Sequence, residues 1–226
     1  MLAHCAGQMD WNCRQRAYMS CLVILKSQLR FDRAPTKKPE MEHADSRLEG
    51  CAQSDFWFTE LTPKQHYAKN AALDNAIRTR FGAAREAAAR CELFAWRATP
   101  EGRLAEILVL DQFSRNVYRD TVRAFAQDPL ALALAQELVA SGQDRSLPLA
   151  RRSFAYMPYM HSESALIHQQ AVTLFSQAGM EDSLRFELRH QAIIERFGRY
   201  PHRNALLGRE SSAEELAFLA EPGSSF

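Results

Sequence analysis

Apolar side chains recur at helical spacing through most of the chain. Leu73, Ile77 and Phe81 lie four residues apart, which is the spacing of the buried face of an amphipathic helix. This pattern predicts a helix over residues 63–80, ended by Gly82. Comparable patterns predict further helices over residues 83–96, 103–116, 128–140, 161–177, 181–197 and 212–219. No stretch alternates apolar and polar residues over the length of a strand, so we predict an all-α fold, a compact array of antiparallel helices without significant β-sheet.

Capping signals support several of these boundaries. Thr62-Pro63 and Thr99-Pro100 each place an N-cap residue before a proline at the first helical position. Ser211 or Ser212 is expected to cap the last helix. The helix over residues 103–116 is apolar nearly all round, so we expect it to occupy the centre of the fold.

The first 50 residues differ from the rest. They hold most of the cysteines and little helical periodicity, and residues 32–40 form a polar stretch with two prolines, typical of a linker. Two interpretations stay open: a loosely packed N-terminal extension, or an over-extended reading frame whose true start is near Met41. We therefore predict that residues 1–50 are poorly structured and that residues 51–226 form a single helical domain.

Composition narrows the classes of function. The formal net charge of +1 gives no bulk electrostatic argument for nucleic-acid binding. No apolar run approaches the ~20 residues of a membrane helix. The cysteines lack the CxxC spacing of zinc ligands, and their odd number, five, argues against a disulfide scaffold and for a reducing compartment. We expect a soluble, cytoplasmic protein with no nucleic-acid or membrane partner.

Polar residues concentrate in three segments, of which the first directly follows the most apolar helix. Asp111 and Arg115 are four residues apart and can pair on one helix face. Arg115, Arg119 and Arg123 repeat at the same spacing, so a continued helix would carry a cationic row. The alternative is a solvated helix end with local ion pairs, worth ~0.3–0.5 kcal/mol each.

The second segment surrounds His161. Pro158 disfavours a helical residue before it, so the next helix is expected to begin at about His161. A His–Glu pair such as His161 and Glu163 can perform acid–base chemistry. A metal site would need a third ligand, for which His190 is the obvious candidate. A structural histidine at a helix start is the alternative.

The third segment, residues 196–209, holds four arginines and one histidine, punctuated by two glycines and a proline. Such a turn displays guanidinium and backbone N–H groups together, which suits a phosphate or a carboxylate. Alternatively, these arginines cap neighbouring helices and bridge between elements.

Several long motifs together carry a family resemblance. They are FWFTELTP, RLAEILVLDQFSRNVYRDTVRAFAQDPLAL, MPYMHSES and HQAIIERFGRYPHRNALLGR, followed by SSAEELAFL. Over residues 55–226 the chain resembles the bacterial family called domain of unknown function 924. The resemblance implies a helical fold of the tetratricopeptide-like superfamily, and no established activity, substrate or cofactor. Glu106 stands where the family tends to have an apolar residue. Residues 157–160 replace a Leu-Pro-Leu-Glu-like segment, which removes an acidic neighbour of His161 and weakens an acid–base role there.

Three functional hypotheses follow. The first is binding of an anionic ligand, either a phosphorylated metabolite or an acidic peptide, in an arginine-rich pocket. Its candidate residues are Asp111, Gln112, Arg115, Asn116, Arg119, Arg199, His202, Arg203, Asn204 and Arg209. It requires arginines more than eighty residues apart in the sequence to converge.

The second hypothesis is a hydrolase or lyase whose candidate catalytic residues are His161, Glu163 and His190. No GxSxG, HExxH or P-loop motif supports it. The third is a structural or adaptor protein in which the polar segments form an internal network. The cofactor and the oligomeric state are unknown at this stage.

Overall fold

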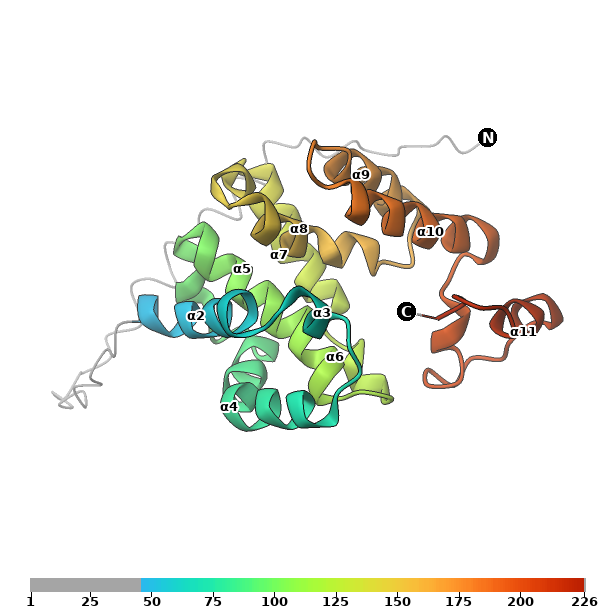
Figure 1. The fold of residues 1–226 in the computed structure, drawn as a ribbon, viewed down its shortest axis with the longest axis horizontal. Coiled ribbons are helices and arrows are strands. Elements are labelled where there is room, and N and C mark those ends of the chain that lie inside the picture. The colour runs from blue at the N-terminus through green and yellow to red at the C-terminus, as the bar shows by residue number, and fades with distance from the viewer. Residues whose placement is uncertain (1–45, 226) are drawn as a thin grey trace, which may run out of the picture. The chain divides into compact units, whose positions relative to one another are not determined.

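The computed structural model describes residues 46–225 (Figure 1), which contain α-helices and short 3-10 and π-helical turns and no β-strand. This confirms the all-α prediction. The predicted start at Met41 and nearly all of the predicted N-terminal extension lie outside the described residues. Helix α2 (Ser46–Asp55) begins before the predicted boundary at residue 50, so the helical region starts earlier than the hydrophobic pattern indicates.

The remaining helices follow in chain order. They are α3 (Pro63–His66), α4 (Ala71–Ala89), α5 (Pro100–Leu108), α6 (Ser114–Val117), α7 (Asp128–Ala140), α8 (Leu149–Met160), α9 (Ala165–Phe175), α10 (Glu181–Phe197) and α11 (Ala213–Leu219). The shorter turns are η1 (Phe56–Glu60), η2 (Phe94–Ala98), η3 (Val109–Phe113), η4 (Val122–Ala124), η5 (Gln143–Ser146) and η6 (Pro201–Arg203).

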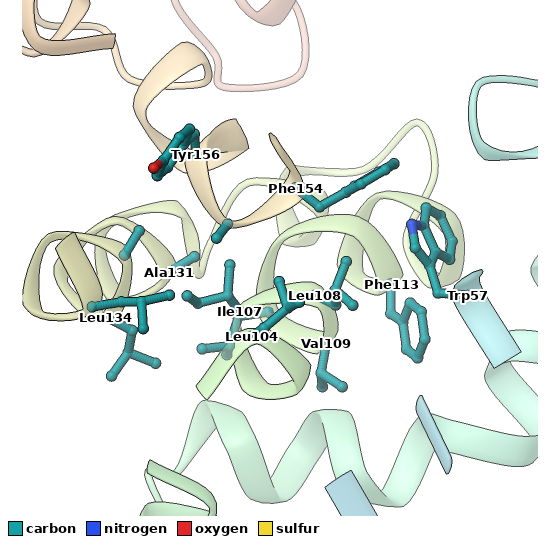
Figure 2. Close-up of a cluster of buried hydrophobic side chains, with 14 of the residues drawn as sticks. Trp57, Leu104, Ile107, Leu108, Val109, Phe113, Ala131, Leu134, Phe154 and Tyr156 are labelled. Atoms are coloured by element: carbon teal, nitrogen blue, oxygen red, sulfur yellow. The ribbon is translucent and has the colours of Figure 1, made fainter. Parts of the chain in front are cut away.

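The central element is the run α5–η3–α6, in which a π-helical turn joins two α-helical stretches. Leu104, Ile107, Leu108 and Leu110 are completely buried, as expected for a helix that is apolar nearly all round. Figure 2 shows several of these side chains meeting residues of α7 and α8. Helix α5 also packs against α2, so the central position predicted for residues 103–116 is confirmed.

Helices α7, α8, α9 and α10 pack in sequence order, each against the next. The predicted bounds of α7 and α10 agree with the structure. Gly142 follows α7 with a φ of 69°, a left-handed conformation that glycine adopts without steric cost. Ser212 caps α11 and its hydroxyl accepts from the backbone N–H of Glu215, which completes a capping box.

The predicted helix over residues 63–80 is two helices. Asn70 breaks it, because its Oδ1 accepts hydrogen bonds from the backbone N–H groups of Ala72 and Leu73, at 2.9 and 3.1 Å, and so caps α4. The predicted stop at Gly82 is wrong, since α4 continues to Ala89. A glycine inside a helix costs only about 1 kcal/mol, which the burial of the helix's apolar face outweighs.

Helix α8 was not predicted, and it contains Pro158. The expected break before Pro158 is therefore wrong. A proline removes one helical hydrogen bond, but this stretch is held by burial of Phe154, Tyr156 and Tyr159 in the core. The following helix begins at Ala165 instead of His161, which is the C-terminal cap of α8.

Glu106, the polar residue in the apolar central helix, is completely buried. Arg97 in η2 holds both of its carboxylate oxygens, at 2.7 and 2.6 Å. This bidentate pair satisfies the buried charge. Among the described helices, none combines the length and the apolar character needed to cross a membrane.

Candidate functional site

Five polar residues from separate parts of the chain meet beside the central helix. We call them the central polar cluster, which consists of Asp111, Arg115, Asp128, His161 and Arg203. They lie in the π-helical turn η3, in α6, at the start of α7, at the end of α8 and in η6. Four of the five were candidates from the sequence, and Asp128 was not.

Asp111 is the most buried member of the cluster, with 1% of its surface exposed. Its Oδ1 lies 2.7 Å from Nδ1 of His161 and 2.8 Å from Nη1 of Arg115. Its Oδ2 accepts a hydrogen bond from the side-chain amide of Gln112 at 2.6 Å. The predicted Asp111–Arg115 pair therefore forms.

These contacts fix the charge state at the dyad of Asp111 and His161. Burial alone would raise the pKa of Asp111, but the neighbouring Arg115 and His161 hold it far below its usual range. Burial, which is the larger cause, and the positive charge of Arg115 both lower the pKa of His161. At neutral pH the histidine is thus neutral and donates its Nδ1–H to the carboxylate. The lone pair is then on Nε2, which is the form a general base requires.

Asp128 joins the two arginines of the cluster. Its carboxylate accepts hydrogen bonds from Nη1 and Nη2 of Arg115 at 2.9 and 3.0 Å. Nη1 of Arg203 approaches the same carboxylate at 3.3 Å. The sequence analysis includes Asp128 only as the first residue of the helix predicted over residues 128–140, where an acidic side chain is favourable without any partner.

Arg203 is 6% exposed and its guanidinium is enclosed by aromatic rings. The guanidinium carbon lies 4.6 Å from the ring centroid of Phe125 and 4.5 Å from that of Tyr200, within cation–π range. Nη2 donates to the carbonyl of His161 at 3.1 Å. Nε is buried and has no hydrogen-bond partner within residues 46–225. Burial, followed by the nearby Arg115, lowers the pKa of Arg203.

Two other candidates, Asn116 and Arg119, contact a different carboxylate. Arg119 donates two hydrogen bonds to Asp74 of α4, at 2.7 and 2.8 Å, and Asn116 donates one at 2.8 Å. We call these three residues the Asp74 cluster. The cationic row that a continued helix would carry does not form, because α6 ends at Val117 and Asp120 has a φ of 59°, which turns the chain away from the helix.

The candidates from the C-terminal segment have carboxylate partners of their own. Arg199 holds both oxygens of Glu215, at 2.7 and 2.8 Å. Arg209 holds both oxygens of Glu163, at 2.6 and 2.9 Å. Glu163 also accepts from the backbone N–H of Tyr200 at 2.8 Å, so it links two loops. Asn204, another candidate of this segment, has no carboxylate in this contact and donates to the hydroxyl of Ser211 at 3.0 Å.

Tyr200 lies among three further histidines. Its ring centroid is 5.8 Å from that of His190, 5.5 Å from that of His202 and 6.3 Å from that of His168. Burial lowers the pKa of His190 to about 3 and that of His202 to about 4. The described part of the chain contains no group of three or more His, Cys, Asp or Glu residues placed to hold a metal ion.

One further buried pair was not predicted by the sequence analysis. Nδ1 of His168 lies 2.6 Å from Oε1 of Glu187, and both side chains are completely buried. They join α9 to α10. The sequence gives no signal for this contact, because the two partners lie on different helices.

Comparison with known proteins gives two matches. Residues 54–223 match the model of DUF924, described as a bacterial protein of unknown function. A solved structure of a protein of unknown function from Agrobacterium tumefaciens has 39% sequence identity, with a TM-score of 0.75 over 78% of this chain and 99% of that chain. No match was found among curated proteins. The chain is therefore a member of the DUF924 family.

Proposed function

We propose that the protein binds an anionic ligand, a phosphorylated small molecule or an acidic peptide, at the central polar cluster. The observation that carries the proposal is the meeting of Arg115 and Arg203 on one carboxylate, that of Asp128. Two guanidinium groups from distant segments thus already hold one anionic group between them. A carboxylate or phosphate from a ligand has the same charge and geometry as this side chain.

The hydrogen bonds of Arg203 support the same proposal. A guanidinium has five N–H donors, and Arg203 uses two of them, one at the long distance of 3.3 Å. Its Nε is left without a partner within residues 46–225. A buried donor without an acceptor costs about 1–3 kcal/mol, so an incoming oxygen that satisfies it contributes to binding.

Solvent reaches the cluster at its outer side. The side chains of Arg115 and Asp128 are 20% and 14% exposed, while that of Asp111 is 1% exposed. An anion from solution therefore meets Arg115 first. It competes with Asp128 for the two guanidiniums, and the buried Asp111 holds Arg115 in place from the other side.

The experiment is a thermal-melting series on the full chain with inorganic phosphate, citrate, nucleoside monophosphates and a glutamate-rich peptide, each compared with chloride at equal ionic strength. Arg203→Lys keeps the charge but loses the forked donors. Arg199→Lys is the matched control, because Arg199 forms its own bidentate pair with Glu215.

We expect one class of anion to raise the melting temperature of the wild type and of Arg199→Lys but not that of Arg203→Lys. At a hundred times the dissociation constant the stabilisation is about 2.7 kcal/mol. Stabilisation that persists in Arg203→Lys, or no stabilisation by any anion, contradicts the proposal. In the second case the structural or adaptor interpretation, an internal polar network, accounts for the cluster.

A second candidate function, acid–base catalysis by a hydrolase or lyase, is favoured by the 2.7 Å contact between Asp111 and His161. A buried carboxylate that orients a neutral histidine leaves Nε2 to accept a proton from a ligand held by the arginines. Glu163 and His190, the other catalytic candidates, are committed to Arg209 and to the carbonyl of Phe186. Turnover of a stabilising anion that His161→Gln abolishes, without loss of binding, supports this candidate, and turnover that survives the substitution excludes it.

We also propose that the helices have a tetratricopeptide-like arrangement. The packing of α7, α8, α9 and α10 each against the next supports a tetratricopeptide-like arrangement, in which helix pairs stack along one direction. We further propose that residues 51–226 are one domain and that the protein acts in the cytoplasm. Circular dichroism and melting of a fragment that begins at Met41 test the domain assignment, because an independent domain melts at the temperature of the full chain.

A further inference from the structure

The buried pair of His168 and Glu187 holds more hydrogen-bond acceptors than donors unless it carries an extra proton. Nε2 of His168 lies 2.9 Å from the carbonyl of Ser162 and 3.3 Å from the hydroxyl of Tyr200. A carbonyl only accepts. The single proton of the Tyr200 hydroxyl goes to the carbonyl of Met160 at 2.5 Å, so this hydroxyl also acts as an acceptor towards His168. Nε2 must therefore carry a proton.

The other ring nitrogen then decides the charge of the pair. A neutral imidazole has one N–H, and that one is on Nε2. The contact of 2.6 Å between Nδ1 and Oε1 of Glu187 consequently needs a second proton, located on Nδ1 or on the carboxyl group. In both arrangements the pair holds one proton more than a neutral histidine beside a carboxylate.

We propose that His168 and Glu187 form a proton-binding site that retains one proton at neutral and mildly alkaline pH and fastens α9 to α10. In an unfolded chain the glutamate loses its proton near pH 4.3 and the histidine near pH 6.5, by about these reference values. Above about pH 6.5 the folded protein therefore binds one proton more than the unfolded chain. Loss of this proton leaves two lone pairs facing each other at the contact between the helices.

The surroundings of Glu187 agree with a retained proton. Its Oε2 is buried and has no hydrogen-bond partner in the described part of the chain. Burial raises the pKa of Glu187, and its hydrogen bond with His168 opposes this shift. A buried carboxylate oxygen without a donor is costly, whereas the same oxygen in a carboxylic acid is neutral.

The other ionisable groups near this site do not titrate in the same window. The groups that interact with the pair are Tyr200, which contacts His168 and lies near Glu187, and His190, which lies near His168. Burial lowers the pKa of His190 to about 3, so this histidine stays neutral. Burial also raises the pKa of Tyr200 above its ordinary value, so its hydroxyl stays protonated.

The test compares the wild type with Glu187→Gln by chemical denaturation between pH 6.5 and 9. The glutamine has the same shape, and its amide donates to the unprotonated Nδ1 without an extra proton. We expect the unfolding equilibrium constant of the wild type to rise up to tenfold per pH unit relative to that of the variant. Parallel pH profiles for the two proteins would overturn the proposal.

A second measurement keeps the proposal testable where the variant does not fold. Long-range proton–nitrogen NMR spectra of the wild type at pH 8 report which ring nitrogens of His168 carry protons, and carbon-13 spectra report the state of the Glu187 carboxyl. We expect a protonated Nε2 together with either a protonated Nδ1 or a carboxylic acid. An unprotonated Nε2, or an unprotonated Nδ1 beside a carboxylate, would refute the site.

Discussion

The Asp74 cluster and the central polar cluster use the same residue types differently. In the Asp74 cluster a single carboxylate receives three hydrogen bonds, two from Arg119 and one from Asn116. In the central polar cluster two guanidiniums, one histidine and two carboxylates share contacts, and Nε of the buried Arg203 has no partner within residues 46–225. The hydrogen bonds of the Asp74 cluster join α4 to α6. In the central polar cluster, Arg203 keeps an N–H donor that the proposed ligand could use.

Removal of the buried carboxylate of the central polar cluster is expected to have the largest effect. Asp111→Ala leaves Arg115 and His161 without their buried acceptor, and breaking a buried ion pair from one side costs about 3–5 kcal/mol. Urea denaturation at pH 7 measures this loss. A loss below that of Asp74→Ala would reverse the ranking of the two clusters.

The corresponding change in the Asp74 cluster is expected to cost less. Asp74→Ala removes the acceptor of Arg119, but the side chains of Asp74 and Arg119 are 12% and 28% exposed, so water replaces part of the contact. We expect a loss of about 1–3 kcal/mol, and the anion response of the melting temperature stays as in the wild type. A lost anion response in a variant that still folds would place the ligand at Asp74 instead.

Acid titration separates the Asp74 cluster from the buried His190, which lies beside Tyr200. Burial lowers the pKa of His190 to about 3. On acidification, His190 therefore binds a proton near pH 6.5 in the unfolded chain but stays neutral in the folded protein. Below about pH 6.5 this difference lowers the free energy of unfolding by up to about 1.4 kcal/mol per pH unit. The pKa of Asp74 is lowered in spite of burial, by Arg119 and Asn116, so its contribution is present above about pH 3.9 and is lost only below it.

Denaturation profiles from pH 7 to pH 3 measure both effects. His190→Gln is expected to flatten the profile between pH 6.5 and 4, while Asp74→Asn is expected to flatten it only below about pH 4. An unchanged slope in His190→Gln would show that this histidine is protonated in the folded state.

Asp128→Asn is expected to destabilise the protein by about 1–2 kcal/mol, since a partly exposed charge-assisted pair is lost. The side chain of Asp128 is 14% exposed. Because this carboxylate competes with a ligand for Arg115 and Arg203, the variant should be stabilised more by the active anion than the wild type is. Melting curves with and without that anion measure the difference, and an equal response would show that Asp128 and the ligand occupy different places.

The smallest effect is expected at Arg199. Arg199→Ala removes the pair with Glu215, in which the arginine side chain is 31% exposed and the glutamate side chain 4% exposed. Because Glu215 still accepts a hydrogen bond from the backbone N–H of Ser212, we expect a loss of about 1 kcal/mol, and anion binding should not change. A large loss of stability would show that the folded state depends on Arg199.

The sequence predicted several of the helix boundaries that depend on residues close together in the chain. The bounds of α7 and α10 follow from capping and helical periodicity, and the structure confirms them. The break at Asn70 and the proline inside α8 were missed, because a cap competes with periodicity in the first case and core packing overrides proline in the second. The Asn70 cap is a local contact, whereas the packing that holds Pro158 inside α8 involves residues that no short window of sequence contains.

The same limit applies to the candidate site. Asp111 and Arg115 were paired correctly because they are four residues apart on one helix. Asp128 was missed, and the pairing of Arg119 with Asp74 was not predicted, because these contacts join residues distant in the sequence. Glu163 and Arg209 were candidates for different roles, and their ion pair in the structure was not predicted.

The π-helical turn at residues 109–113 has a consequence for how the chain tolerates insertions and deletions. A π-turn is closed by i→i+5 hydrogen bonds and so holds one residue more than an α-helical turn. Removing one residue from this turn would let it close into a regular α-helix with the segment after it facing nearly the same way, so Arg115 would still face α7. Each residue of a regular α-helix contributes about 100° of rotation, so removing one residue from α5 would instead turn Arg115 away from α7. A one-residue deletion is therefore expected to be tolerated better within residues 109–113 than in the helix before them.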